Sequence, residues 1–226
     1  MLVAARNEAE RIGATLAALQ RAFPGAPVWV ADDGSSDATP QIARAAGARV
    51  VRSAPAIGKG GAVTHAALAA VDDAGMTVGD PTYKSVFVLC DGDLGDSAAE
   101  LVALADAVAR GDAELAVGAF ATRIGGGFGL ALAFARWAIR RRCGLQTRAP
   151  ISGQRALGEQ ALRDVLPFAH GYGMEVGMTI DAVRAGHRVL EIELELTHRA
   201  SARTLAGFAH RARQLADFAR VYVSRR

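Results

Sequence analysis

Residues 85–96, SVFVLCDGDLGD, decide the fold, because a strongly apolar strand ends there in alternating aspartate and glycine. A continuous apolar run without polar alternation is typical of a strand buried on both faces of a parallel sheet. The carboxylates of Asp91 and Asp93 can bind a hard divalent cation, and Gly92 between them lets the backbone approach a ligand. Asp-Gly-Asp is also a common turn, so the segment alone leaves a purely structural role open.

The same alternation of apolar strand and amphipathic helix runs through the first half of the chain. Strands are predicted over 2–5, 28–32, 48–52, 85–91 and 114–120, and helices over 8–22, 37–46, 60–73 and 97–109, the last opened by the capping-box pattern of Ser97 and Glu100. The less regular second half predicts helices ending near 142 and over 158–165, 174–185 and 203–223, and a strand over 187–196. This pattern indicates an α/β fold, a single domain over 1–226 with a mostly parallel central sheet and a C-terminal helix.

Polar loops follow the first four predicted strands. They are ARNEAE (5–10), DDGSSD (32–37), IGKGGA (57–62) and DGDLGD (91–96). Ligands of doubly wound sheets bind beyond the carboxyl ends of the strands, so the four loops are expected to meet at one edge. The set is much more specific than any one of its members.

Two of these loops suggest a nucleotide ligand. Asp32 and Asp33 stand together at a strand end and could accept hydrogen bonds from a base or ribose, whereas the Ser36–Asp37 end suits a turn and helix cap. Lys59 lies among glycines at a helix start, which suits a diphosphate. The segment is no P-loop, since Gly60 replaces the Ser or Thr that follows the lysine there. A solvated lysine in a loop remains the structural alternative.

Composition bounds the class of protein. The chain has 226 residues, 51% hydrophobic and 22% charged, which excludes a disordered chain. The most apolar stretch, 128–139, is shorter than a membrane span and is interrupted by Arg136. No secretory leader opens the chain, and the two cysteines, Cys90 and Cys143, form no disulfide framework, so a reducing cytoplasm is expected.

Charge is distributed unevenly along the chain. The net charge is +3, yet residues 115–158 contain no Asp or Glu and seven arginines, and after Glu195 the only acid is Asp217. This asymmetry suggests an anionic partner for the C-terminal half, although the arginine content also fits a codon bias. Nucleic acid is not expected, because aromatic residues do not interleave with the arginines. The run FGLALAFARWAIRRR, 128–142, suits either a helix at an anionic membrane surface or a core helix with a solvated basic end.

The motifs ARNEAE, DDGSSDAT, GKGGA, DGDLGD, ISGQRAL (151–157) and GYGMEVGMTID (171–181) together resemble the GT-A glycosyltransferases of family 2 type over residues 2–210. Glucosyl-3-phosphoglycerate synthases and dolichyl-phosphate mannosyltransferase-like enzymes are the most similar branches. The resemblance implies a Rossmann-like GT-A domain that binds a nucleotide sugar with residues 1–120 and an acceptor with residues 121–226.

The resemblance also implies roles for particular positions. Nucleotide-sugar binding falls to Ala5, Asn7, Glu8, Asp32, Asp33, Lys59, Asp91 and Gly92. The metal would be Mg²⁺ or Mn²⁺, held by Asp93 and His198, and the catalytic residues would be Asp93 and Glu175. Acceptor binding falls to Arg123, Ser152, Gly153, Arg155 and Tyr172. Purely structural roles are also open for both: Glu175 could stabilise the helix dipole, and His198 could be a packed histidine.

The implied activity is metal-dependent transfer of a hexose from a nucleoside diphosphate sugar, with UDP preferred, to a phosphate-bearing acceptor. The chain is shorter than phosphoglycerate-using members and lacks the C-terminal membrane spans of many lipid-phosphate transferases, so phosphoglycerate and polyprenyl phosphate both stay open as acceptors. A sugar nucleotidyltransferase and a non-catalytic nucleotide-sugar-binding module are the alternatives. A cytoplasmic location, with or without peripheral membrane contact at the inner face, is expected. The sequence does not decide between a monomer and a homodimer.

Overall fold

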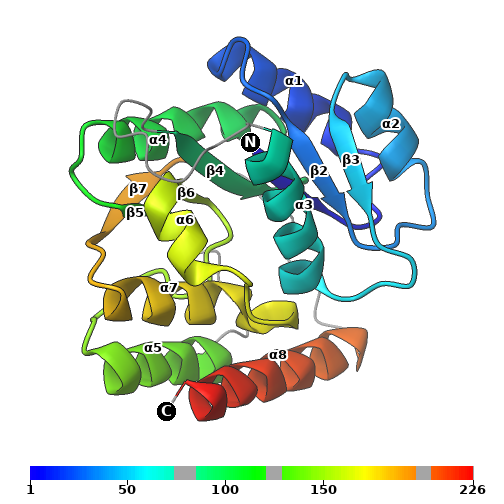
Figure 1. Cartoon of the computed structure of the whole chain (residues 1–226). Coiled ribbons are helices and arrows are strands. Elements are labelled where there is room, and N and C mark those ends of the chain that lie inside the picture. Colours follow the sequence, from blue (N-terminus) through cyan, green and yellow to red (C-terminus); the bar gives the residue numbers. More distant parts are fainter. Residues whose placement is uncertain (74–84, 121–128, 197–204, 226) are drawn as a thin grey trace.

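The computed structural model describes residues 1–73, 85–120, 129–196 and 205–225. A seven-stranded sheet lies at its centre (Figure 1). The strands are β1 (Leu2–Ala5), β2 (Trp29–Asp32), β3 (Arg49–Arg52), β4 (Val86–Asp91), β5 (Leu115–Phe120), β6 (Arg155–Gly158) and β7 (Val189–Leu194), in the spatial order β3-β2-β1-β4-β6-β5-β7. The predicted α/β architecture with a mostly parallel sheet is confirmed.

One strand runs against the others. β6 pairs antiparallel with both β4 and β5, while every other neighbouring pair is parallel. No strand was predicted over residues 155–158, and this was wrong; their sequence, RALG, contains no β-branched or aromatic residue, unlike the equally short β1, β2 and β3. The reversal matters for function, since it brings the residues before β6 to the edge where β4 ends; Leu89 of β4 is paired with Arg155 of β6.

Helices cover both faces of the sheet, as the buried strands require. One face is covered by α1 (Ile12–Ala22), α2 (Thr39–Ala45), the 3₁₀ helix η1 (Gly95–Leu101) and α4 (Val102–Ala109), which bury Ile12, Leu16, Ala43, Leu101 and Leu104 among others against it. The other face is covered by α3 (Lys59–Asp73), α6 (Glu159–Val165) and α7 (Met174–Arg184). Side chains alternate along β4, with Val88 and Cys90 in the first layer and Phe87 and Leu89 in the second.

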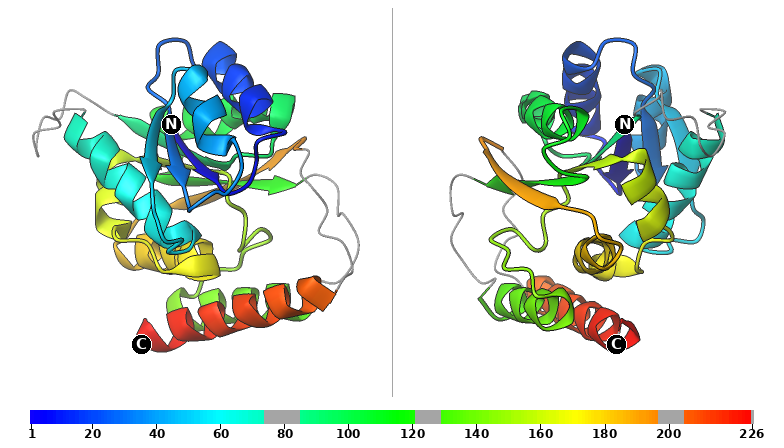
Figure 2. Two further views of the ribbon diagram at one scale, coloured as in Figure 1. Left: turned by 90° about the vertical axis from the view of Figure 1, so that its right-hand side faces the viewer. Right: turned by 60° about the vertical axis from the view of Figure 1, so that its left-hand side comes forward.

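A further layer lies outside α7. The helices α5 (Gly129–Cys143) and α8 (Leu205–Ser224) lie side by side beneath it in every view (Figures 1 and 2). A separate core holds this layer together, in which Ala135 and Ile139 of α5 pack with Val176 and Ile180 of α7 and with Phe218 of α8. No helix within the described residues is long and apolar enough to cross a bilayer.

Helix starts differ most from the predictions. The helix expected from residue 8 begins at Ile12, because residues 8–11 form a turn in which the carbonyl of Glu8 accepts the amides of Arg11 and Ile12. The helix expected over 97–109 begins earlier, as the 3₁₀ turns of η1 at Gly95. Both starts belong to the polar loops after strands, where local hydrogen bonds compete with helical ones.

Candidate active site

The four polar loops meet in one cleft at the carboxyl ends of the strands, as the sequence predicted. The cleft has a volume of about 630 Å³. Its described lining consists of Ala4, Ala5, Arg6, Glu8, Ala31, Asp33, Gly58, Lys59, Ala62, Asp91, Gly92, Asp93, Gly171, Tyr172, Ala216, Asp217 and Arg220. Parallel pairing of β1 with β2 and with β4 aligns the strand ends and so brings the loops together.

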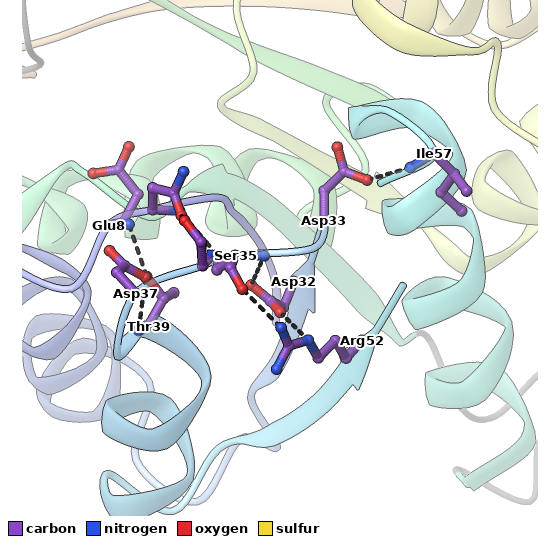
Figure 3. A network of polar contacts seen from close by, with 10 residues as sticks. Glu8, Asp32, Asp33, Ser35, Asp37, Thr39, Arg52 and Ile57 are labelled. Atoms are coloured by element: carbon purple, nitrogen blue, oxygen red, sulfur yellow. Dashed lines mark hydrogen bonds and ion pairs between the residues drawn. The ribbon is translucent and has the colours of Figure 1, made fainter. Parts of the chain in front are cut away.

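Asp33 joins the second loop to the third. Its Oδ1 accepts the backbone amides of Ile57 at 2.7 Å and Gly58 at 3.0 Å, as Figure 3 shows for Ile57. The Arg6 guanidinium lies 3.7 Å from its other oxygen. These contacts fix the carboxylate in the cleft wall at the start of α3.

Asp32, its neighbour, faces the protein interior. It is fully buried, its Oδ1 accepts the amide of Ser35 at 3.3 Å, and its Oδ2 lies 3.2 Å from Arg52 Nε (Figure 3). The described cleft lining includes neither Asp32 nor Asn7. Asn7, at a positive φ of 56°, binds the second loop instead, because its Oδ1 accepts the amide of Ser36. Both residues therefore hold the loops in place, while Glu8 and Ala5 reach the cleft.

Lys59 lies between two carboxylates at the floor of the cleft. Its Nζ is 2.6 Å from Asp91 Oδ1 and 2.7 Å from Glu175 Oε1. Burial opposes the charged form, but the two carboxylates prevail and raise the pKa of Lys59 above its ordinary value. Glu175, in the first turn of α7, is only 6% exposed and lies outside the described lining of the cleft.

The segment before β6 supports this ion triad from the opposite side. Gln154 Nε2 donates to Asp91 Oδ2 at 2.9 Å, and Ser152 Oγ donates to Gln154 Oε1 at 3.0 Å. A Cβ on Gly153 would lie 2.6 Å from Lys59 Nζ and 2.7 Å from Asp91 Oδ2, so a larger residue there would push the ends of both side chains out of their present contact. Ser152 and Gly153 were predicted to contact the acceptor, whereas Gln154 was not singled out, although ISGQRAL contains it.

Arg155 is a structural cation in this fold. It is fully buried, its guanidinium donates to the carbonyls of Ser152 and Pro150 and to the hydroxyl of Thr179, and burial lowers its pKa to about 10. It ties the segment before β6 to α7, so it shapes the cleft without lining it.

Asp93 is the carboxylate of the site that could take up a cation. It lines the cleft, and no hydrogen bond or ion pair joins it to another residue in the described parts of the chain. Asp91 stands two residues before it. Mg²⁺ is commonly bound by one or two carboxylates together with substrate phosphates, so this pair of oxygen donors fits Mg²⁺ or Mn²⁺. The described residues contain no cluster of three or more potential ligands; His198, the predicted second ligand, and Arg123, a predicted acceptor contact, lie outside the described residues.

The C-terminal helix closes the cleft from the far side. Asp217 Oδ2 accepts the amide of Tyr172 at 3.1 Å, and its Oδ1 pairs with Arg220 at 2.8 Å. A Cβ on Gly171 would lie 2.3 Å from Asp217 Oδ2, so α8 rests directly on the turn η2 (Gly171–Gly173). Tyr172 was predicted to contact the acceptor, but Asp217 and Arg220 were not identified; the isolation of Asp217 as the last acid of the chain was the available signal.

Comparisons with known proteins agree with this geometry. The family model described as Glycosyl transferase family 2 matches residues 1–166. A dolichyl-phosphate hexose transferase of Haloferax volcanii is 30% identical over 204 residues, which are 90% of this chain and 84% of the relative.

Solved structures extend the similarity to the C-terminal helix. Glucosyl-3-phosphoglycerate synthase from Mycobacterium tuberculosis, in complex with Mg²⁺ and uridine diphosphate, is 28% identical with a TM-score of 0.76, over 99% of this chain and 77% of that one. The same enzyme with Mn²⁺, UDP-glucose and glycerol 3-phosphate gives 27% identity and a TM-score of 0.73, over 99% and 78% of the two chains. The expected GT-A-like fold is thereby confirmed.

Proposed function

Because the chain belongs to glycosyl transferase family 2, we propose that it transfers a hexose from a UDP-sugar to a phosphate-bearing acceptor with the help of Mg²⁺ or Mn²⁺. Family membership makes it a glycosyltransferase, so the nucleotidyltransferase and the non-catalytic module are dropped. The observation that carries the proposal is the cleft in which Asp93 lies next to the triad of Lys59, Asp91 and Glu175.

The donor half of the cleft is built from residues 1–120. Gly58, Lys59 and Ala62 line the cleft at the start of α3, and the amides and positive dipole of a helix N-terminus favour the diphosphate of a nucleotide sugar. Glu8 and Asp33 offer carboxylate acceptors for the nucleoside. UDP is preferred because the solved glucosyl-3-phosphoglycerate synthases carry UDP or UDP-glucose.

Asp93 and His198 would hold the metal, with Asp91 beside Asp93. When bound, the metal supplies a positive charge that stabilises the diphosphate leaving group. Asp91 is held in place by Lys59 and Gln154. Lys59 contributes a fixed cation at the same end of the cleft, where negative charge develops as the bond from the sugar to the diphosphate breaks.

Glu175 acts as an orienting group in this proposal. Its Oε1 already accepts the Lys59 ammonium, and the side chain is almost wholly buried, which leaves it poorly placed to take a proton from an acceptor. A phosphate oxygen needs no base, since it carries negative charge at neutral pH, whereas a hydroxyl must lose its proton. This difference favours a phosphate oxygen as the attacking atom, as in a polyprenyl phosphate, over a hydroxyl of phosphoglycerate.

The acceptor half is formed by residues 121–226. Tyr172 and Arg220 line the cleft on the side of α8, and Arg123 is proposed to join them. Ser152, Gly153 and Arg155 shape this wall from behind, through the contacts described above. The acceptor oxygen forms a bond to the anomeric carbon of the hexose while the bond to the diphosphate breaks, and UDP leaves with the electron pair.

The test is release of UDP from UDP-glucose, with GDP-mannose as the competing donor, in the presence of polyprenyl phosphate or 3-phosphoglycerate. Turnover with UDP-glucose that stops on addition of EDTA is expected, as is its loss in Asp93→Asn. The matched control is Asp96→Asn, since Asp96 lies in the same loop but is exposed and paired with Arg21. Equal turnover in Asp93→Asn and wild type, or metal-independent turnover, would overturn the proposal.

A further inference from the structure

We propose that the outer face of α5, continued by α8, binds the surface of an anionic membrane. The face is defined by Leu130, Ala133, Trp137, Arg140 and Arg141 of α5, all exposed, and by Val223 and Arg220 of α8. The binding does not depend on the reaction proposed above.

The arrangement of α5 separates a packed side from an open side. Ala131, Ala135, Ala138 and Ile139 are buried. The residues at 130, 133, 137, 140 and 141 follow the spacing of one helix face and point away from that core. Large apolar side chains lie on the open side, where Leu130 is 81% exposed and Trp137 is 49% exposed. From the sequence, this segment suited either a core helix or an interfacial helix. The side chains on its exposed side are those of an interfacial helix.

Aromatic side chains of α5 and α8 contact one another at this face. The Trp137 ring lies 4.7 Å from that of Tyr222 and 5.5 Å from that of Phe134. The Arg142 guanidinium lies 3.7 Å from the centre of the Tyr222 ring. Tryptophan and tyrosine are enriched where a protein meets the headgroup region of a bilayer, because their rings are apolar with one polar atom.

The charge of this face complements an anionic surface. Arg136, Arg140, Arg141 and Arg142 form no ion pair with any carboxylate of the described residues. No acid occurs anywhere in 115–158. On the neighbouring helices, Asp217 is paired with Arg220 and Asp181 with Arg225. Of the four, Arg136 donates to the carbonyl of Arg148 and Arg142 lies over the Tyr222 ring, while Arg140 and Arg141 are exposed. Arginines without a carboxylate partner beside exposed apolar groups attract anionic headgroups.

The face also reaches the cleft. Arg220 and Ala216 line the cleft, and Val223, which is 53% exposed, follows Arg220 by three residues on the same side of α8. A membrane on this face would therefore lie at the acceptor side of the cleft, where a lipid phosphate could enter.

The experiment is flotation of the purified chain with vesicles of phosphatidylcholine alone or mixed with phosphatidylglycerol, at low and high salt. Retention on the anionic vesicles alone, weakened by salt, is expected. The double variant Arg140→Gln/Arg141→Gln should lose about thirtyfold in partitioning, about fivefold for each arginine near the surface. Its matched control is Arg11→Gln/Arg44→Gln, which removes the same charge from the exposed ends of α1 and α2, at the opposite side of the molecule (Figure 1).

A spectroscopic readout locates the contact. With Trp29→Phe as the background, Trp137 is the only tryptophan of the chain, and its emission should shift to the blue on anionic vesicles. Absence of retention at low salt, or an equal loss in the Arg11/Arg44 control, would overturn the proposal. So would a stable dimer in which Trp137 is shielded with and without vesicles, since the face would then join two copies of the chain. All of these readouts are independent of sugar transfer.

Discussion

Replacement of Lys59 by methionine tests the ion triad at the floor of the cleft. Lys59 is 23% exposed and bridges Asp91, 36% exposed, and Glu175, 6% exposed. Methionine keeps most of the apolar stem but removes the charge, so two carboxylates are left facing one another. Removing one partner of a buried ion pair typically costs about 3–5 kcal/mol. Since water can screen the half-exposed Asp91, we expect the lower end, about 3 kcal/mol.

Urea denaturation measures this loss as a lower midpoint at an unchanged slope. The matched double variant Lys59→Met/Glu175→Gln removes the uncompensated buried charge and should recover most of the stability. The pKa of Lys59 is raised in the folded state, so its contribution is fully present below the unfolded pKa and is lost only as pH rises through the higher folded value. The gap between wild type and Lys59→Met should therefore stay constant from neutral pH to about pH 9.

Two results would refute this account of the triad. One is a loss below about 1 kcal/mol in Lys59→Met, which would place the pair among weak surface contacts. The other is a double variant no more stable than the single one, which would mean that Glu175 is not left uncompensated.

Three further predictions concern packing, pH and the C-terminal helix. Gly60→Ala places a Cβ 1.8 Å from a backbone carbonyl oxygen of the loop before α7, so it should cost about 3 kcal/mol in urea denaturation. Hydrogen bonds from Arg188 lower the pKa of Glu114 from 4.5 to about 2; its contribution is present above the unfolded value and lost as pH falls towards 2, so Glu114→Gln should flatten the acid limb of a stability profile over that range. Asp217→Asn weakens the charge-assisted bond to the Tyr172 amide and should cost about 1–2 kcal/mol in thermal melts, whereas an unchanged melting temperature would show that α8 is held elsewhere.

The meeting of the polar loops at one edge could be predicted from the sequence, because it follows directly from the order of parallel strands. Buried parallel strands end at one edge, so the loops carrying Glu8, Asp33, Lys59 and Asp91 could be brought together without knowing any side-chain contact. The partners of those side chains were not predictable in the same way. The bond from Gln154 to Asp91 depends on the reversal of β6, whose sequence RALG contains no β-branched or aromatic residue that would predict a strand.

A second limit on predicting the site from the sequence is that adjacent residues of the same type can have different roles. Asp32 and Asp33 look equivalent in the sequence, yet Asp32 is the last residue of β2 and Asp33 the first residue after it, and successive side chains of an extended chain point to opposite sides. Asp32 turns inward to Arg52, and Asp33 turns towards the cleft. Arg155 likewise lies in a segment typical of a binding site, but its guanidinium donates hydrogen bonds to carbonyls and a hydroxyl of the interior. Only burial thus distinguishes an internal polar residue from one that can contact a ligand, and burial depends on tertiary packing.

The net charge of +3 conceals two populations of arginine. Arg155 and Arg225 are internal, the first hydrogen-bonded to carbonyls and the second paired with Asp181, so neither offers its guanidinium to an external partner. The arginines at 140–142 have no carboxylate partner among the described residues, and they follow Trp137 on one helix. A codon bias would enrich arginine wherever it is tolerated, but it would not remove every acid from 115–158. Uncompensated charge is costly to accumulate on one face, so its concentration in the last turn of α5 argues for an anionic partner at that face.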